Sequence, residues 1–421
     1  MRALYVLATW VAFALLGPAL SLMRKTRGGF WQRLGFYHPG SLPVGGSPRI
    51  WLHGASAGDL LSLSPMIDRL RARFPQAKVI ISTMTNTGHL MATERLKKKI
   101  DAVVYAPWDL WGATRRAARA VKADLLVLEY TEIWPNLIRA VHESGARIAL
   151  TNGRFSPRRL EWYRRFFALI ENPLADVDLF LMREQEEAER VLLLGAAPER
   201  VRVTGNTKFD ALAPKEQAVE DHALGAALGL PAGARVLIAG STHDGEEESV
   251  LSAYRALLVS APDLRLVIAP RYIERADRVV ALATAAGFEV GLRSAGNPRK
   301  APVVVLDSIG ELAQAYRLAT LVFVGGSFTQ RGGQNILEPA AQGKPVLFGP
   351  HMENFHDSVQ VLVGRGGIQV KDAEQLARVI AELLARPESL ASLGTLASSV
   401  VRQISGASDR NVEAMARLVS P

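Results

Sequence analysis

The stretch "RIWLHGASAGDLLSLSPMIDRLRARFPQAKVIISTMT", Arg49 to Thr85, contains the structural pattern that the rest of the chain repeats. Two short runs of β-branched and aliphatic residues, at 49–54 and 78–85, flank a segment whose apolar residues have helical spacing. Runs that are apolar at nearly every position are typical of parallel strands covered on both faces. This stretch therefore predicts one strand–helix–strand unit of a doubly wound α/β fold.

The same alternation continues through both halves of the chain. In the first half, further strand-like runs are "DAVVYAP", "DLLVLEY", "RIALTN", "VDLFLMR" and "VRVTGN". The strand signals lapse between Ala211 and Leu224, where charge and proline increase, and we expect the connection between domains there. The pattern then returns in "RVLIAGST", "LRLVIAP", "APVVVLD", "LATLVFVGGS", "KPVLFGP" and "GGIQV". Two Rossmann-like domains are therefore predicted, over residues 28–212 and 213–421.

The composition excludes some kinds of chemistry and indicates the charge of the partner. At 421 residues the chain suits two domains of about 150–200 residues each. It contains no cysteine, which excludes disulfides and thiolate chemistry. The net charge of +9 favours an anionic partner, whether a membrane surface, a nucleic acid or a phosphorylated substrate.

The N-terminus favours the membrane among these partners. The segment from Leu4 to Met23 carries no charge, and the basic residues Arg24, Lys25, Arg27 and Arg33 follow it. We expect residues 1–27 to form an apolar membrane-anchor helix. The basic flank predicts that the domains lie on the cytoplasmic side of the inner membrane. Pro18 leaves open a full span or an interfacial anchor, and a buried first helix is the alternative.

Several loops of the second half have the form of a nucleotide site. Ligands of doubly wound sheets bind at the carboxyl ends of the strands. The polar or glycine residues at such positions are Ser241, Thr242, Arg271, Gly325, Gly326 and Ser327. Free N–H groups at a helix start suit a phosphate, and an arginine can clamp its oxygens. Neither G-x-G-x-x-G nor G-x-x-x-x-G-K-[ST] occurs, which disfavours dinucleotide oxidoreductases and P-loop enzymes.

The first half places carboxylates at strand ends. Asp59 follows the first strand, and Glu129 and Glu132 follow the "LLVL" run. An acid at a helix start can simply complement the helix dipole, so Asp59 is either such an acid or a proton acceptor. Glu132 is likewise either a helix cap or a site residue. The eight histidines show no metal-ligand spacing, so we expect neither a metal nor a cofactor.

A basic and aromatic segment, "RFSPRRLEWYRRFFALI" at 154–170, is a second membrane candidate. Arginines such as Arg154 and Arg158 alternate with aromatic residues at helical spacing. This pattern suits an anionic membrane surface or a phosphorylated lipid. The alternative is a solvated basic face over core aromatics. Because the apolar N-terminus favours the membrane, we expect no nucleic-acid partner.

The loops, taken in order, resemble those of the Kdo transferases of lipopolysaccharide assembly. The likeness runs through "HGASAGD", "TMTNTG", "EYTEIWPN", "NGRFSPR", "GNTKFD", "GSTHDGEEE", "PRYIER", "GGSF" and "GGQNILEPAAQGKPVLFGP", and so through nearly the whole chain. The resemblance implies a GT-B glycosyltransferase whose two domains face a cleft. It implies transfer of 3-deoxy-octulosonate (Kdo) from CMP-Kdo to a lipid A precursor. The first domain would bind the acceptor and the second the nucleotide sugar.

The resemblance also implies roles for single residues. Asp59 stands where the family has a glutamate that resembles a general base toward the acceptor hydroxyl. An inverting transfer needs such a carboxylate, and helix N-termini with Arg271 can stabilise the departing phosphate without a metal. Asn335 and Glu338 match the nucleotide-contacting stretch, beside the strand-end residues of the second half. The residues expected to contact the acceptor are Ser56, Gly58, Glu132, Arg154 and Arg158.

Three residues depart from the family pattern. Asp59 stands at the position of the family's glutamate. Tyr272 stands at the histidine of the family's P-R-H motif, and Gln334 at the histidine of its G-G-H-N motif. Neither Tyr272 nor Gln334 titrates near neutral pH. These changes indicate a divergent member. They leave open a related transferase with another sugar or acceptor, and a catalytically silent nucleotide-binding homologue.

Overall fold

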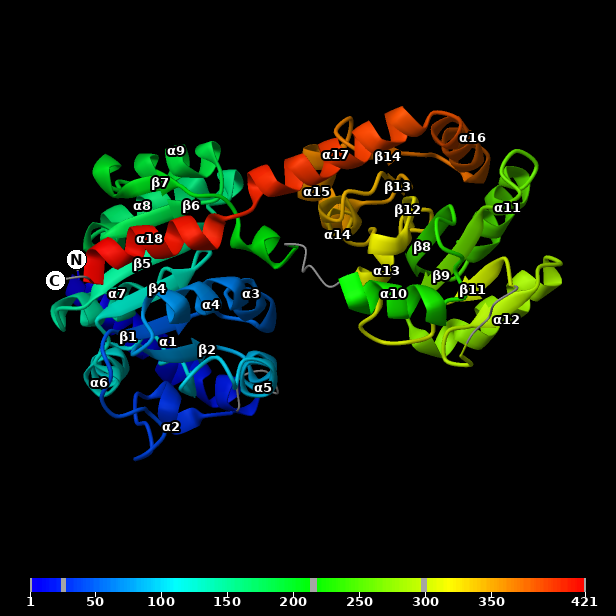
Figure 1. Cartoon of the computed structure of the whole chain (residues 1–421). Helices are drawn as coiled ribbons and strands as arrows, with labels where there is room; N and C mark the ends of the chain where they lie inside the picture. Colours follow the sequence, from blue (N-terminus) through cyan, green and yellow to red (C-terminus); the bar gives the residue numbers. More distant parts are fainter. Residues whose placement is uncertain (1, 24–27, 213–217, 297–300, 420–421) are drawn as a thin grey trace. The chain divides into compact units, whose positions relative to one another are not determined.

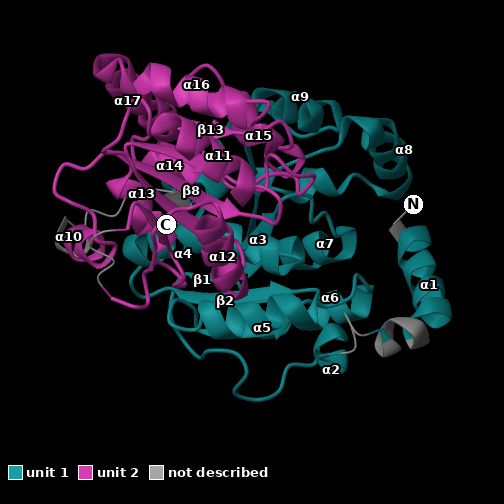
Figure 2. Ribbon diagram, turned by 90° about the vertical axis from the view of Figure 1, so that its right-hand side faces the viewer, with its two compact units in different colours: residues 1–211, 404–421 teal, residues 212–403 magenta. Residues whose placement is uncertain are grey.

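The computed structural model describes residues 2–23, 28–212, 218–296 and 301–419, which fold as two compact units. The first unit comprises residues 1–211 together with 404–421, and the second comprises residues 212–403 (Figure 2). Each unit is built around one seven-stranded parallel sheet (Figure 1). The predicted doubly wound α/β class is therefore confirmed. The facing of the two domains across a cleft stays a prediction.

The sheet of the first unit has the strand order β3-β2-β1-β4-β5-β6-β7. Its strands are β1 (Arg49–His53), β2 (Lys78–Thr83), β3 (Ala102–Tyr105), β4 (Leu125–Glu129), β5 (Arg147–Gly153), β6 (Leu179–Met182) and β7 (Val201–Val203). All seven correspond to runs recognised in the sequence. Successive side chains of β1 enter opposite cores, with Trp51 on one face and Ile50 and Leu52 on the other.

Helices cover both faces of this sheet. The α-helices are α1 (Arg2–Leu22), α2 (Phe30–Arg33), α3 (Ala57–Ser62), α4 (Ser64–Arg73), α5 (Asn86–Arg95), α6 (Trp111–Val121), α7 (Pro135–Glu143), α8 (Leu160–Ile170), α9 (Gln185–Leu193) and α18 (Ala407–Val419). Short 3₁₀ turns are η1 (Pro157–Arg159), η2 (Pro173–Asp176), η3 (Pro198–Arg200) and η4 (Thr207–Leu212). Helices α6 to α9 contribute to the core that contains Trp51, and α3, α4, α5 and α18 to the opposite core.

The C-terminal helix α18 belongs to the first unit, which the sequence analysis did not expect. Its apolar residues Val412 and Met415 are buried in the core beside α4. The carboxylate of Asp210 accepts hydrogen bonds from the backbone N–H groups of Gly406 and Ser408, at 2.6 and 2.5 Å. These groups precede or begin α18 and lack partners within the helix. Asp210 therefore fixes the point where the chain returns.

The second unit has the strand order β10-β11-β9-β8-β12-β13-β14. Its strands are β8 (Val236–Thr242), β9 (Arg265–Pro270), β10 (Val290–Leu292), β11 (Val303–Val305), β12 (Leu321–Val324), β13 (Val346–Phe348) and β14 (Gly367–Gln369). The helices are α10 (Ala218–Ala227), α11 (Glu247–Leu257), α12 (Ala276–Ala285), α13 (Leu312–Leu318), α14 (Leu337–Ala341), α15 (His356–Leu362), α16 (Ala373–Leu384) and α17 (Pro387–Ile404), with 3₁₀ turns η5 (Ile273–Arg275) and η6 (Glu353–Phe355). Strand β10 was missed because this edge strand is short and half-buried.

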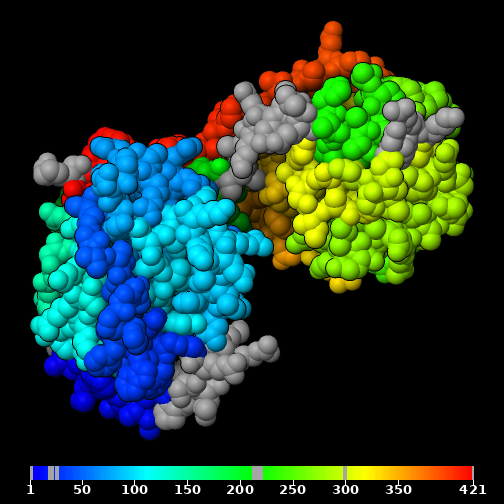
Figure 3. Space-filling view, turned by 60° about the horizontal axis from the view of Figure 1, so that its bottom comes forward, coloured from blue at the N-terminus to red at the C-terminus, as the bar shows by residue number. Residues whose placement is uncertain are grey.

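The predicted membrane-anchor helix of residues 1–27 is not found as such. Residues 2–22 do form the helix α1, but no helix in the described part of the chain is long and apolar enough to cross a membrane. Helix α1 lies on the surface of the first unit (Figure 3). Tyr5 donates a hydrogen bond to Asp109 at 2.7 Å, and the ring of Phe13 packs 4.9 Å from that of Trp108. Leu4 and Leu15 remain 65% and 75% exposed.

The expected basic flank also needs correction at Arg33. Arg24, Lys25 and Arg27 lie outside the described residues. Arg33 is fully buried and donates hydrogen bonds to the carbonyl oxygens of Gly28 and Met84, at 2.8 and 2.9 Å. Its guanidinium also lies 4.6 Å from the ring centroid of Tyr105. Its two backbone acceptors and an aromatic ring make it part of the fold rather than of a basic surface.

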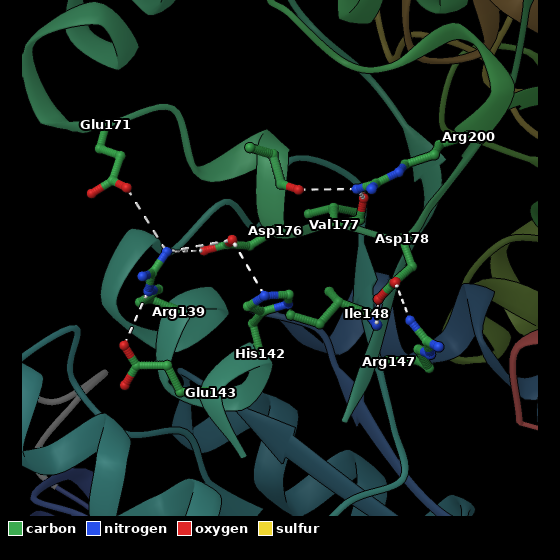
Figure 4. A network of polar contacts seen from close by, with 11 residues as sticks. Arg139, His142, Glu143, Arg147, Ile148, Glu171, Asp176, Val177, Asp178 and Arg200 are labelled. Atoms are coloured by element: carbon green, nitrogen blue, oxygen red, sulfur yellow. Dashed lines mark hydrogen bonds and ion pairs between the residues drawn. The ribbon is translucent and has the colours of Figure 1, made fainter. Parts of the chain in front are cut away.

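A polar network joins α7, η2 and the starts of β5 and β6 (Figure 4). Asp178 accepts hydrogen bonds from the backbone of Ile148 and from the guanidinium of Arg147, both at 2.9 Å. Asp176 lies 3.2 Å from Arg139 and 3.7 Å from His142. Asp176 and Asp178 precede β6 and Arg147 begins β5, at the edge of the sheet opposite the carboxyl ends of the strands. The network therefore serves the fold.

Candidate functional site

Each sheet has a point where the strand order reverses, and several of the predicted residues follow the strands at these points. In the first unit the reversal lies between β1 and β4, which precede Asp59 and Glu132. In the second unit it lies between β8 and β12, which lead into the loops containing Thr242 and Gly325. Such crevices are where doubly wound sheets bind ligands. Within each unit, the fold thus brings together loops that are far apart in the sequence.

Asp59 is the third residue of α3 and forms a capping box with Ser56. The backbone N–H of Ser56 donates to Asp59 Oδ2 at 2.8 Å, and that of Asp59 approaches Ser56 Oγ at 3.5 Å. Asp59 therefore does help to cap the N-terminus of α3. Asp59 is nevertheless partly exposed, as is Ser56, and Gly58 is exposed. Within the described part of the chain, Oδ1 of Asp59 accepts no hydrogen bond, so one oxygen is free to take a proton.

Glu132 is held as a carboxylate beside a buried histidine. Trp134 Nε1–H donates to Glu132 Oε2 at 2.8 Å, and His53 Nε2 lies 3.4 Å from the same oxygen. Burial raises the pKa of Glu132, but the contacts with His53 and Trp134 outweigh it and hold the pKa below its ordinary value. Glu132 therefore carries a fixed negative charge at neutral pH.

His53 is a further candidate site residue, which the sequence analysis did not single out. It ends β1, is fully buried, and lies with Nδ1 2.9 Å from Ser82 Oγ. Ser82 Oγ accepts a hydrogen bond from Trp51 Nε1 at 2.7 Å, which leaves its own hydrogen for His53 Nδ1. The proton of a neutral imidazole then lies on Nε2, toward Glu132. The signal in the sequence that could have identified His53 is its position as a polar residue at the end of an apolar strand.

The two predicted acceptor arginines lie beyond β5. Arg154 and Arg158 are both exposed, and among the described residues neither guanidinium forms an ion pair. The hydroxyl of Thr131 donates to the carbonyl of Arg154, which ties this loop to the loop after β4. In the adjacent helix α8, Trp162 is 57% exposed and stacks 5.0 Å from Phe166. The segment thus presents both unpaired cations and apolar surface.

The glycine loop of the second unit is organised by Glu246, another residue that the sequence analysis did not identify. Its fully buried carboxylate accepts N–H groups from Gly326 at 2.6 Å and Ser327 at 2.8 Å. It also accepts those of Phe328 at 2.7 Å and His243 at 2.9 Å. These N–H groups of the loop are thus already bonded within the protein. Their use for a phosphate stays a prediction.

Close packing at the same place explains one glycine. A Cβ atom on Gly325 would lie 2.6 Å from the Cα atom of Thr242. Thr242 is buried and donates to Glu247 Oε1 at 3.0 Å, while its neighbour Ser241 has a left-handed φ of 55°. Residue 325 must therefore be glycine for the β8 and β12 loops to meet.

The remaining predicted donor residues are Asn335, Glu338 and Arg271, of which Glu338 has a half-buried carboxyl group. Asn335 Nδ2 approaches Glu338 Oε1 at 3.5 Å, and Asn335 Oδ1 accepts the N–H of Leu337 at 3.1 Å. Burial raises the pKa of Glu338, although Asn335 and the charge of Arg271 oppose it. The side chain of Arg271 is exposed, and its backbone N–H donates to the carbonyl of Thr242 at 2.9 Å.

The two divergent residues of this unit meet at one imidazole. Gln334 Nε2 lies 3.3 Å from His243 Nε2, and the ring of Tyr272 packs edge-on to that of His243 at 5.7 Å. Burial lowers the pKa of His243; the charge of Glu246 opposes this, but the charges of Arg331, Arg275 and Arg271 lower the pKa further. His243 is thus neutral at physiological pH. In the described residues, no group of three or more His, Asp or Glu side chains has the arrangement of a metal site.

Comparisons with known proteins identify the family. Residues 28–211 match the family model described as 3-deoxy-D-manno-octulosonic-acid transferase (kdotransferase). The 3-deoxy-D-manno-octulosonic acid transferase of Haemophilus influenzae is 32% identical over 386 residues, which cover 90% of this chain and 88% of that protein. The chain belongs to the Kdo transferase family. The Bordetella pertussis member is 31% identical, covering 87% of this chain and 86% of its own. The protein is thus a glycosyltransferase.

Solved structures agree with the architecture. The UDP-GlcNAc 2-epimerase of Neisseria meningitidis bound to UDP-GlcNAc has a TM-score of 0.59 at 14% identity, covering 88% of this chain and 100% of that one. This likeness supports the fold of two parallel-sheet domains. The C-terminal CMP-Kdo binding domain of WaaA from Acinetobacter baumannii is 30% identical, covers 44% of this chain and 97% of that one, and has a TM-score of 0.41.

Proposed function

We propose that this transferase moves Kdo from CMP-Kdo to a phosphorylated lipid A precursor, with inversion at the anomeric carbon, at the cytoplasmic face of the inner membrane. The observation that carries the proposal is the free Oδ1 of Asp59 at the reversal point of the first sheet, in a chain similar to Kdo transferases over nine-tenths of its length. A carboxylate placed there can accept the proton of an acceptor hydroxyl.

In the proposed reaction, Asp59 Oδ1 takes the proton of the acceptor hydroxyl as its oxygen bonds to the anomeric carbon of Kdo. The bond from that carbon to the CMP phosphate breaks on the opposite face, and its electron pair leaves with the phosphate. Arg271 lies after β9 and can stabilise that anion. Glu338 and Asn335 would contact the nucleotide. The reaction needs no cofactor in this scheme.

The proposed acceptor and membrane contacts lie on exposed parts of the first unit. Arg154 and Arg158 are unpaired cations for phosphate groups, within the described residues. Helices α1 and α8 contribute apolar side chains at a surface, including Leu7 at 61% and Trp162 at 57% exposure. Their helices are in contact. Apolar side chains beside unpaired cations suit an anionic membrane surface.

The transfer assay tests the proposal directly. Purified protein is given CMP-Kdo and a tetraacylated lipid A precursor, and the lipid is analysed by mass spectrometry. The proposal expects one or more Kdo residues added to the lipid and an equal amount of CMP released. Binding of CMP without any transfer would favour a silent homologue. Transfer only from another activated sugar would favour a related transferase with a different donor. The specific reason to consider that function is that Tyr272 and Gln334, which depart from the family pattern, both contact His243.

A further inference from the structure

A buried carboxyl group lies behind the helix that carries Asp59. Glu129 ends β4 and is fully buried. Its oxygens contact Ser62 Oγ at 2.7 Å, Thr151 Oγ1 at 2.6 Å and Asn152 Nδ2 at 2.5 Å. Ser62 is 6% exposed, and the other two are fully buried. No ion pair with Glu129 occurs among the described residues. A buried carboxylate without a cationic partner is costly.

The number of hydrogens at Ser62 indicates the protonation state of Glu129. The Ser62 hydroxyl oxygen lies 2.7 Å from the carbonyl oxygen of Asp59 and 2.7 Å from Glu129 Oε1. A hydroxyl has a single hydrogen to donate, and a carbonyl oxygen has none. Both short contacts are satisfied when Ser62 donates to Asp59 and Glu129 donates to Ser62. The geometry is thus complete only if Glu129 carries a proton.

The same carboxyl group joins a closed ring of buried polar residues. Asn152 Nδ2 donates to both Glu129 Oε1 and Thr207 Oγ1, each at 2.5 Å. Thr207 Oγ1 donates to the carbonyl of Ser62 at 3.1 Å, and the contact between the Ser62 hydroxyl and Glu129 Oε1 closes the ring. The ring links α3 to β4, β5 and η4. It therefore fixes the C-terminal end of the short helix whose third residue is Asp59.

We propose that Glu129 is a positioning residue for Asp59: in its protonated form it completes the hydrogen-bond chain through Ser62 to the Asp59 backbone and holds α3 in place. The catalytic meaning of this inference rests on the proposed function, whereas the protonation of Glu129 does not. When Glu129 ionises, the single hydrogen of the Ser62 hydroxyl can be donated either to the carbonyl of Asp59 or to Glu129 Oε1, but not to both. The hold on α3 then weakens and proton transfer at Asp59 slows.

The surroundings place this ionisation near neutral pH. Burial raises the pKa of Glu129 to about 7, although Thr151, Asn152 and Ser62 oppose the rise, and the charge of Asp59 adds to it. Four further titratable or charged groups stand nearby: Tyr130, Arg183, His53 and Glu132. Tyr130 is neutral, because burial and the charges of Glu129 and Asp59 raise its pKa, while its hydrogen bond with Ser62 and the charge of Arg183 oppose that rise. On the neighbouring strand β1, His53 faces Glu132.

The first experiment measures stability and needs no substrate. A raised pKa in the folded state gives stability that is present below pH 4.5 and lost as pH rises through about 7. Between pH 5.5 and 7, the unfolding equilibrium constant of the wild type should rise about tenfold relative to that of Glu129→Gln. Glu187→Gln, at another buried glutamate of the first unit, should keep the wild-type slope. Equal slopes in Glu129→Gln and the wild type would overturn the proposal.

The second experiment measures Kdo transfer across pH. The wild-type kcat should fall about tenfold between pH 6 and 8 relative to that of Glu129→Gln, whose amide keeps a hydrogen for Ser62 at every pH. KM for CMP-Kdo should not change. Ser62→Ala should lower kcat and leave CMP binding unaltered. If Glu129→Gln and the wild type share one pH profile, Glu129 does not position Asp59. An inactive wild type refutes the proposed function, while the stability slopes still decide the protonation of Glu129.

Discussion

Glu246 offers the sharpest test of how the proposed donor site is built. Its carboxylate accepts four backbone N–H groups, two on each oxygen: His243 and Gly326 on Oε2, Ser327 and Phe328 on Oε1. In Glu246→Gln, one oxygen becomes an NH₂ group that faces two donors. Each lost charge-assisted bond costs about 1.5–3 kcal/mol, so the free energy of unfolding of the second unit should fall by about 3–6 kcal/mol.

The assay for this prediction combines thermal unfolding with calorimetric CMP binding. Glu246→Gln should unfold at lower temperature and bind CMP more weakly, because the β8 and β12 loops lose their common acceptor. Glu248→Gln, an exposed glutamate two residues further along, serves as the control and should behave as the wild type. If Glu246→Gln matched the wild type in both measurements, the loop would not depend on this carboxylate and the reasoning would be refuted.

Three further predictions concern the proposed donor site, the N-terminus and the structural network. Arg271→Ala should weaken CMP binding by about 1.5–3 kcal/mol in calorimetry, and Glu338→Ala should also weaken it; unchanged affinity in both would move the donor site elsewhere. A chain lacking residues 1–27 should sediment less with anionic vesicles, and undiminished sedimentation in high salt would assign the anchor to another segment. Asp178→Asn should lower the free energy of unfolding by about 1–3 kcal/mol, since it loses an ion pair and weakens a backbone bond. Its kcat at a permissive temperature should equal that of the wild type, and a large drop would mean that this network reaches the site.

The sheets could be predicted because each strand carries its own signal. Runs such as "LLVLE" are apolar at successive positions, since parallel strands are buried on both faces. Strand β10 lacks that signal because it lies at the edge of its sheet. The return of α18 to the first unit could not be read from its sequence. Its amphipathic pattern suits either core, and the deciding contact comes from Asp210, almost 200 residues earlier in the chain.

Candidate site residues could be identified in the sequence where a side chain stands at a strand end, and were missed where a side chain binds distant backbone. Asp59 and Glu132 follow strands, so their place at the sheet edge was visible. Glu246 appeared as one acid in "GEEE", because its bonds to the loop after β12 join residues 80 and more positions apart. Arg33 was assigned to a basic flank because sequence does not show that its guanidinium is buried and donates to the carbonyls of Gly28 and Met84.

The most direct test of the account is the turnover number of Asp59→Asn on a confirmed lipid acceptor. The amide oxygen can still accept the N–H of Ser56, so the cap should lose only about 0.3–1 kcal/mol of helix-dipole stabilisation and CMP binding should be unchanged. If Asp59 is the base, kcat falls by about 10²–10⁴. Asp59→Glu, which restores the carboxylate found in the family, should keep substantial activity. Near-wild-type turnover in Asp59→Asn would contradict the account, because the acid at this helix start would then be a cap and nothing more.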